Sequence, residues 1–271
     1  MDKISIITTF YNAQTFIGNA IGSVLGQKVP DGCEIEYVLV DDKSQDNSRN
    51  IVENIINNTS KENFKFKLVE PENNLGCGGA RKFGIENATG NYFMFLDADD
   101  YYIHLDFVEN AYNTITSENA DVVEYGVIYN QQNGQQTNST APQKIVLTDP
   151  HDMEIALFKD NLIKFNVWSK IYTRKIVESY PYSTRRTFED VRTIPVWISN
   201  CNKVVIMPIP QINYRAASNS IIRTNWVDTR LGTISAIAQL FPRFKDDRQL
   251  LKAMYTRSMI DLEAILNNKS S

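Results

Sequence analysis

The first 120 residues alternate short apolar segments with longer segments in which apolar residues recur at helical spacing. Short β-branched or aromatic runs are typical of buried strands, whereas apolar residues three and four apart are typical of helices packed on a sheet. Regular alternation of the two predicts an α/β fold with a mostly parallel sheet flanked by helices. Strands are expected at 3–9, 35–40, 64–69 and 92–96, and helices at 16–27, around 51–56, just before 88 and at 105–118.

The pattern changes after residue 120. Segments 122–129 and 144–147 flank an Asn- and Gln-rich tract that contains Asn133-Gly134, and Asn-Gly between strands is a strong hairpin signal. We therefore expect a β-hairpin insertion with a long tip. Further helices are expected within 151–200, strands at 203–207 and 211–215, and a helical C-terminal tail at 227–240 and 246–267.

The composition is that of an ordinary soluble protein. Of its 271 residues 42% are hydrophobic, and no apolar run approaches the ~20 residues that span a membrane. Met1-Asp2-Lys3 leads directly into the first expected strand without a signal peptide, so we expect a cytoplasmic protein with no integral membrane segment. Cys33, Cys77 and Cys201 are too scattered for a disulfide framework or a zinc site.

Charge is divided unevenly along the chain. Residues 1–158 carry 10 Lys and Arg against 23 Asp and Glu, whereas residues 159–271 carry 18 against 9. A basic second half is suited to an anionic partner, although a basic face can equally be solvated or set against the acidic half. Charge alone leaves these alternatives open.

Three carboxylates, Asp97, Asp99 and Asp100, directly follow the expected strand 92–96. Open α/β sheets bind ligands at the carboxyl ends of their strands. Crowded carboxylates repel one another, and a divalent cation shared with substrate phosphates is a common compensation. The alternative is that Asp99 or Asp100 caps the next helix.

Polar motifs follow four of the expected strands. They are TFYN at 9–12, VDDKSQD at 40–46, NLGCGGAR at 74–81 and DAD at 97–99. In this order they resemble the TxYN, VDDxSxD, NxGxxxAR and DxD motifs of the inverting family 2 glycosyltransferases of GT-A fold. The resemblance continues with WSK at 168–170, ED at 189–190, YR at 214–215 and SI at 220–221. It covers residues 3–225 and departs from the family at Lys82-Phe83, where a small polar residue or Asn is commoner.

The resemblance implies a domain organisation. Residues 1–225 would form a Rossmann-like GT-A catalytic domain, with a nucleotide-sugar-binding half at 1–120 and an acceptor half at 121–225. Residues 226–271 would form a helical appendage through which copies of the chain could associate as a homo-oligomer. Residues 218–223, which follow Arg215, are expected to close over the donor as a lid.

The donor site is expected to bind a UDP-sugar. Tyr11 offers a ring on which a base can stack, and Asp42 can accept the imide N–H of uracil, although Asp42 could also be a turn or cap residue. Glycines at 76, 78 and 79 would let the backbone approach the nucleotide, and Arg81 would reach the base or diphosphate. As the resemblance implies, Asp97 would hold the ribose and Asp99 would bind Mn²⁺ or Mg²⁺. The remaining expected donor residues are Thr9, Asn74, Ala98, Trp168 and Arg215; Trp168 could instead be a core residue.

The resemblance also places a catalytic base at Asp190, beside Glu189. Such a base takes the proton of the acceptor hydroxyl opposite the leaving UDP, which gives inversion. Arg185 and Arg186 precede the pair and Arg192 follows it, so these cations are expected to keep Asp190 ionised. The alternative is a pair that only caps a helix. Glu189, Arg185 and Arg186 are assigned to the acceptor side.

The acceptor is less well specified. A surface glycan on a lipid carrier is the first expectation, and an anionic polymer such as a polyol phosphate or hydroxymethylated phage DNA, a nucleic acid acceptor, is the alternative. Arg185, Arg186, Arg243, Lys245 and Arg248 are the candidate contacts for such a polyanion. A catalytically silent nucleotide-sugar-binding module would be expected to lack Asp99 or Asp190. A nucleotidyltransferase or dinucleotide-binding protein would need a Gly-rich loop after the first strand, where TFYN stands.

Overall fold

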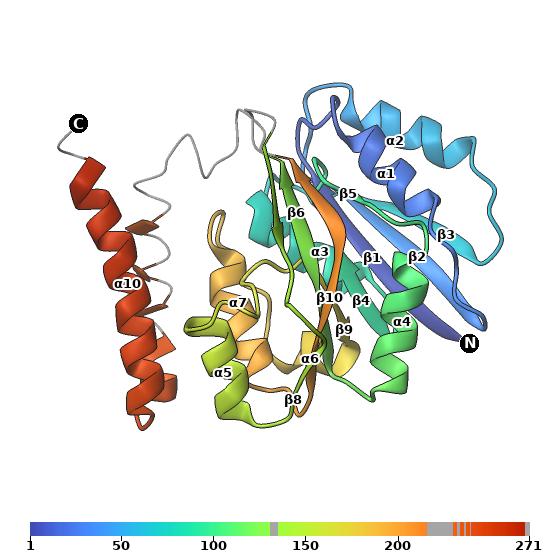
Figure 1. The fold of residues 1–271 in the computed structure, drawn as a ribbon. Coiled ribbons are helices and arrows are strands. Elements are labelled where there is room, and N and C mark those ends of the chain that lie inside the picture. The colour runs from blue at the N-terminus through green and yellow to red at the C-terminus, as the bar shows by residue number, and fades with distance from the viewer. Residues whose placement is uncertain (131–134, 216–229, 232–233, 236, 239, 269–271) are drawn as a thin grey trace.

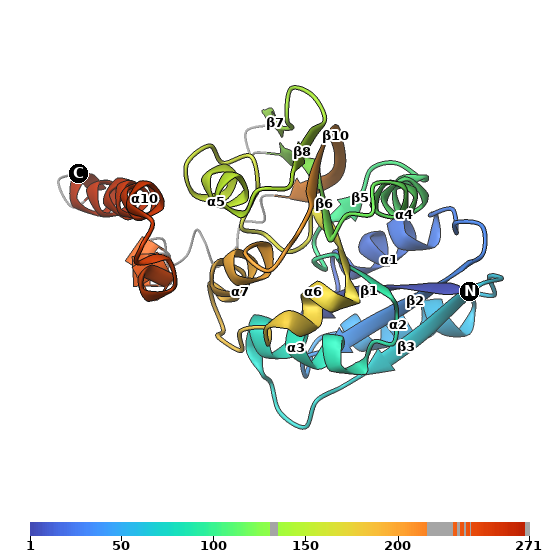
Figure 2. The same cartoon turned by 90° about the horizontal axis from the view of Figure 1, so that it is seen from below.

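The computed structural model describes residues 1–271 except 131–134, 216–229, 232–233, 236, 239 and 269–271 (Figure 1). The described strands form one ten-stranded sheet with helices on both of its faces. Helices α1 (Ile17–Leu25) and α4 (Phe107–Ser117) lie on one side, and α3 (Gly76–Asn87) and α6 (Arg174–Ser179) lie on the other (Figure 2). The predicted α/β fold is therefore confirmed.

One half of the sheet is parallel. It contains β3 (Phe64–Val69), β2 (Cys33–Asp41), β1 (Asp2–Phe10) and β4 (Tyr92–Phe95), paired in that order. Parallel neighbours need a crossover, and α1, α2 (Ser48–Asn57) and α3 supply it between successive strands. The carboxyl ends of these strands therefore meet at one edge, where Tyr11, Asp42 and Asp97 follow directly.

The other half of the sheet is mixed. β9 (Lys170–Thr173) runs antiparallel to both β4 and β6 (Val122–Asn130), and β10 (Val204–Arg215) runs parallel to β6. β5 (Tyr101–Tyr102) pairs antiparallel with β10 and completes the order β3-β2-β1-β4-β9-β6-β10-β5. The two strands expected at 203–207 and 211–215 are one strand, whose register shifts around Pro210.

The hairpin prediction was wrong in its second strand. β6 pairs with β7 (Gln136–Ser139), whereas β8 (Ile145–Leu147) pairs with β10. The physical reason is burial, because against β10 the side chains of Ile145 and Leu147 pack on the hydrophobic core. The expected turn at Asn133-Gly134 lies outside the described residues.

Three helices, not a continuous helical region, occupy the part of the chain between 150 and 200. They are α5 (Pro150–Phe158), α6 and α7 (Glu189–Ile198). Asp149 caps α5 by accepting hydrogen bonds from the backbone N–H groups of His151 and Asp152, and Pro150 occupies the first turn. The strand β9, which the sequence pattern did not predict, lies between α5 and α6.

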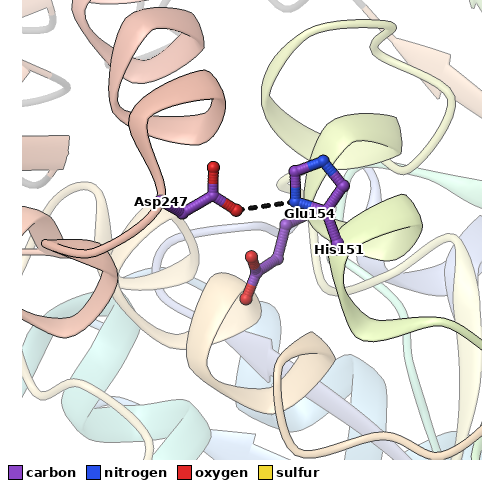
Figure 3. Close-up of side chains that lie close together, drawn as sticks. All are labelled: His151, Glu154 and Asp247. Atoms are coloured by element: carbon purple, nitrogen blue, oxygen red, sulfur yellow. Dashed lines mark hydrogen bonds and ion pairs between the residues drawn. The ribbon is translucent and has the colours of Figure 1, made fainter.

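The C-terminal helix α10 (Arg248–Asn268) follows a short 3₁₀ helix, η1 (Phe241–Phe244), and packs against α5. Figure 3 shows the contact at its start, where Asp247 faces His151 with Glu154 beside them. His151 Nδ1 lies 2.6 Å from Asp247, and this hydrogen bond raises the pKa of His151. Part of the expected helix 227–240 lies outside the described residues. Among those described, no helix combines the length and apolarity needed to cross a bilayer.

A buried ion pair connects β6 to β9. Lys170 Nζ lies 3.4 Å from Glu124, and both side chains are almost fully buried. The same ammonium group donates to the carbonyl oxygens of Lys164 and Asn166, at 2.8 and 2.6 Å, while Glu124 accepts from the backbone N–H of Lys164. The pair therefore fixes the loop that leads to Trp168.

Lys170→Met should lower the free energy of unfolding by about 3–5 kcal/mol, because it leaves the buried negative charge of Glu124 without its cation. The double variant Glu124→Gln/Lys170→Met removes both charges and should recover part of that loss. Denaturant unfolding measures both. A double variant no more stable than the single one would show that the uncompensated charge is not the cause.

Candidate active site

A cavity of about 800 Å³ opens at the carboxyl ends of β1 and β4. It collects ten of the residues expected from the sequence to form a site. They are Thr9, Tyr11, Arg81, Asp97, Ala98, Asp99, Trp168, Arg186, Glu189 and Asp190. Asp42, Asn74, Gly76, Arg185 and Arg215 do not line it. Residues from both halves of the chain therefore share one cavity.

Three carboxylates crowd the end of β4. Oxygen atoms of Asp97, Asp99 and Asp100 lie within 4.8 Å of one another, close enough to hold a metal ion together. Burial, reinforced by the negative charge of Asp97, raises the pKa of Asp99 to about 6 and that of Asp100 well above its usual value. Asp100 Oδ1 accepts the backbone N–H of Arg215, but its Oδ2 is buried without a hydrogen-bond partner. An unsatisfied oxygen among mutually repelling acids fits a divalent cation.

Arg81 is the cation that faces this cluster. Its guanidinium is buried and donates to Asp97, 2.5 Å away, and to Glu189. Burial alone would lower the pKa of Arg81, but the neighbouring negative charges, that of Asp97 first, raise it well above its usual value. Arg81 is thus a permanent positive charge that ties α3 to the end of β4 and to the start of α7.

Asp190 occupies the first turn of α7, next to the buried Glu189. Phe188, which precedes them, has a left-handed backbone with φ of 59°, a conformation that costs a bulky residue roughly 1–2 kcal/mol. Burial, followed by the negative charge of Glu189, raises the pKa of Asp190 to about 7, and Arg81 opposes the rise. A carboxylate with this pKa is suited to accept a proton near neutral pH.

The expectation that neighbouring cations keep Asp190 ionised was wrong. The sequence placed three cations beside it that would favour ionisation, yet its pKa is raised and the opposing cation is Arg81, from α3. Arg186 instead donates to the side-chain and backbone oxygens of Asn74, at 2.8 and 2.9 Å. Arg185 and Arg192 line a separate cavity. Proximity in sequence did not correspond to proximity in space.

Asp42, Asn74 and Gly76 form one hydrogen-bonded loop. Asp42 accepts the backbone N–H groups of Leu75 and Gly76, at 2.7 and 2.8 Å, and its own carbonyl oxygen accepts from the Asn74 side chain. Burial raises the pKa of Asp42 despite these bonds. The carboxylate therefore holds the start of α3, which agrees with the turn or cap alternative.

The glycines of this loop meet protein rather than open cavity. A Cβ at Gly78 would lie 2.3 Å from the carbonyl oxygen of Arg185 and 2.4 Å from that of Ser183. Gly76 has a φ of 73°, and a Cβ there would lie 2.6 Å from Arg186. These positions lack a side chain because segment 183–190 packs closely on α3, a neighbour that the sequence did not indicate.

Aromatic rings line the opposite wall. Trp168 is 7% exposed and stacks on Tyr214, with ring centres 5.8 Å apart and planes 9° apart, so it is both a core residue and a cavity wall. The guanidinium of Arg215 instead lies over the rings of Tyr101 and Phe16. Ten further residues line this cavity although the sequence had not assigned them to it: Phe10, Asn12, Ala13, Phe16, Cys77, Tyr129, Asn166, Thr187, Phe188 and Tyr214. Four of them lie within the motifs, namely Phe10, Asn12, Cys77 and Tyr214.

The expected lid and two of the expected polyanion contacts are not among the residues that line this cavity. The expected lid at 218–223 and the motif Ser220-Ile221 lie outside the described residues. Lys245 and Arg248 are exposed and line neither this cavity nor the second one.

Comparison with known proteins finds relatives over most of the chain. Residues 5–181 match the sequence profile of the family described as glycosyl transferase family 2. Glycosyltransferase GlyG of Streptococcus pneumoniae is 26% identical over 233 residues, which make up 83% of this chain and 74% of GlyG. The chain spans less than half the length of several other curated relatives.

Solved structures share the fold at low identity. The complex of S. aureus TarS with UDP-GlcNAc has a TM-score of 0.68 at 18% identity, over 88% of this chain and 66% of that one. The mannosyltransferase PcManGT from Pyrobaculum calidifontis, in complex with GDP-Man and Mn²⁺, has a TM-score of 0.64 at 17% identity, over 98% of this chain and 75% of that one. Both support a GT-A arrangement of the sheet.

Asp99→Asn should weaken Mn²⁺ binding by at least about 10-fold, because an amide lacks the charge that compensates the cation. Asp31→Asn is the control, since Asp31 is exposed and lines neither cavity. In the wild-type protein the affinity should also fall as the pH drops through about 6, because Asp99 is then protonated. Titration calorimetry measures both effects. Equal affinities in Asp99→Asn and wild type would place the cation elsewhere.

Proposed function

The chain belongs to glycosyl transferase family 2, and on that premise we propose that it transfers a sugar from a UDP-sugar to an acceptor hydroxyl, with inversion at the anomeric carbon. One observation carries the proposal. Asp97 and Asp99 of the carboxylate cluster after β4 line the same cavity as the near-neutral Asp190 at the start of α7. A cation-holding group and a proton acceptor in one cavity are what transfer from a sugar diphosphate requires.

Asp97, Asp99 and Asp100 would hold the Mn²⁺ or Mg²⁺. Once bound there, the cation would neutralise the diphosphate of the departing UDP. Arg81 holds the Asp97 side chain in place through their ion pair. Two features support a metal at this position: the partnerless oxygen of Asp100 and the raised pKa of Asp99.

The donor nucleoside would lie against Thr9 and Tyr11, at the carboxyl end of β1. Tyr11 is 48% exposed, so its ring is available for a base to stack on. Asp42, Asn74 and Gly76 shape the loop at the start of α3 and do not line the cavity. The structural neighbour that binds UDP-GlcNAc supports UDP as the nucleotide.

The acceptor would enter from the side of α7. Asp190 takes the proton of the attacking hydroxyl, while Glu189 is held by Arg81 and so leaves Asp190 to act as the base. The stacked rings of Trp168 and Tyr214 form an apolar wall against which a sugar ring can pack. A single base opposite the leaving group gives inversion.

Asp190→Asn should lower kcat by roughly 100-fold or more with donor affinity nearly unchanged, because the amide has the same shape but cannot take a proton. The transfer rate and the UDP-sugar dissociation constant are measured side by side, with Asp31→Asn as the control. The assignment of Asp190 as base would be wrong if Asp190→Asn turned over normally or lost donor binding.

The dependence of kcat on pH tests the same assignment. Only the ionised carboxylate accepts a proton, so kcat should fall as the pH drops through about 7, the pKa to which burial raises Asp190. Glu189→Gln removes the neighbouring negative charge and should move this fall to lower pH. A pH profile identical in Glu189→Gln and wild type would assign the titration to another group.

A further inference from the structure

A second cavity has a volume of about 490 Å³. Part of its lining directly precedes, in the sequence, a segment that lines the active-site cavity. Residues 180–185 line the second cavity, and residues 186–190 line the first. Lys82 on α3, Arg192 and Val196 on α7, and Leu240 complete its lining. One continuous segment therefore forms part of the wall of both cavities.

The lining of the second cavity is positively charged. It contains three cations, Lys82, Arg185 and Arg192, together with the hydroxyl groups of Ser183 and Thr184. Among the residues that the structure describes, no Asp or Glu lines it. The buried rings and aliphatic side chains of Tyr182, Val196 and Leu240 supply apolar walls. Partial exclusion of water strengthens electrostatic interactions inside such a cavity.

These cations act on one another. Burial, followed by the positive charge of Arg185, lowers the pKa of Arg192. Lys82 has a partner in Glu86, 3.4 Å away, but this pair joins one helical turn at the surface, with side chains 39% and 57% exposed, and contributes little. Gathering like charges is unfavourable unless an anion compensates them, and guanidinium groups match the oxygens of phosphate.

We propose that Lys82, Arg185 and Arg192 form a binding site for a phosphate group of the acceptor. This rests on the function proposed above, in which the donor diphosphate lies at the carboxylate cluster of the first cavity. None of the three cations lines that cavity, so they are not placed to hold the donor. The acceptor is the remaining substrate, and its reacting hydroxyl lies at Asp190.

The layout of the wall favours this source of phosphate. Arg185 lines one cavity and Arg186 the other, and consecutive Cα atoms are only ~3.8 Å apart. A flexible polyol phosphate carries hydroxyl and phosphate groups on neighbouring units, so one unit can present its hydroxyl to Asp190 while a nearby phosphate enters the second cavity. A neutral glycan carries no charge that could interact with these cations. Duplex DNA is held by many phosphate contacts along an extended surface rather than by one cavity.

The first experiment measures binding of inorganic phosphate to the full chain. The cavity variant Lys82→Gln/Arg185→Gln/Arg192→Gln should bind phosphate at least about 10-fold more weakly than wild type. The control Lys28→Gln/Lys65→Gln/Lys175→Gln removes the same charge from lysines that line neither cavity and are 63%, 69% and 63% exposed. The control should bind as wild type does. Equal phosphate affinity in both variants, or none in wild type, would overturn the site.

The second experiment identifies the source of the phosphate. With a poly(glycerol phosphate) acceptor, the cavity variant should show a KM raised at least about 10-fold, an unchanged kcat at saturation, and a salt dependence flattened by about one unit for each lost contact. A neutral oligosaccharide acceptor should show no such difference. Transfer to duplex DNA or a lipid-linked glycan, with poly(glycerol phosphate) inactive, would overturn the assignment to a polyol phosphate.

Two further measurements keep the outcomes separable. UDP binding and UDP-sugar hydrolysis without acceptor should be the same in the cavity variant and wild type. If wild type itself lacks both, the proposed function fails, whereas the phosphate titration still decides the cavity. Arg185→Gln alone is the second variant, because Arg185 is exposed and its loss leaves the core intact. It should weaken phosphate binding in the same direction, and unchanged binding would count against Arg185.

Discussion

The buried guanidinium of Arg81 is the interaction on which the site depends. It is the one cation among the described lining residues that contacts carboxylates from both halves of the chain, Asp97 after β4 and Glu189 on α7. Without it the acids of the cavity would repel one another in a partly desolvated space, and α7 would lose its ion pair to α3. Arg81 therefore acts in folding and in electrostatics at once, because the same ion pairs join the two halves and set the charge state of the cavity.

The parallel half of the sheet could be predicted from the sequence because its signals are local. Each βαβ unit carries an apolar run and an amphipathic helix in one continuous stretch, as in β1 and α1. The mixed half could not, because its strands are defined by distant partners. β9 has four residues and is placed by β4 and β6, and β8 pairs with β10 instead of its neighbour in the chain. Short strands of this kind carry too few residues to show a period.

The residue types of the site were also predictable, whereas their environments were not. Motif order indicated the carboxylates of the cavity, but the pKa of Asp190 depends on burial and on Arg81, which lies 109 positions earlier in the numbering. Asp42 and Gly78 show the same limit. The first is engaged by backbone N–H groups, and the second lies under two carbonyl oxygens of a segment about a hundred residues away. Long-range packing of this kind leaves no local pattern in the sequence.

The wall shared by the two cavities has a thermodynamic consequence. Segment 180–190 is held to the Asn74 loop by Arg186 and packs closely on Gly78 of α3, so the same contacts position the parts of the segment that line the two cavities. Two ligands that meet such a wall are linked, and linkage is reciprocal. If a nucleotide in the first cavity changed the affinity of the second cavity for an anion, the anion would change the affinity for the nucleotide by the same factor. The free energy of the complex with both ligands bound would then be the same whichever ligand bound first.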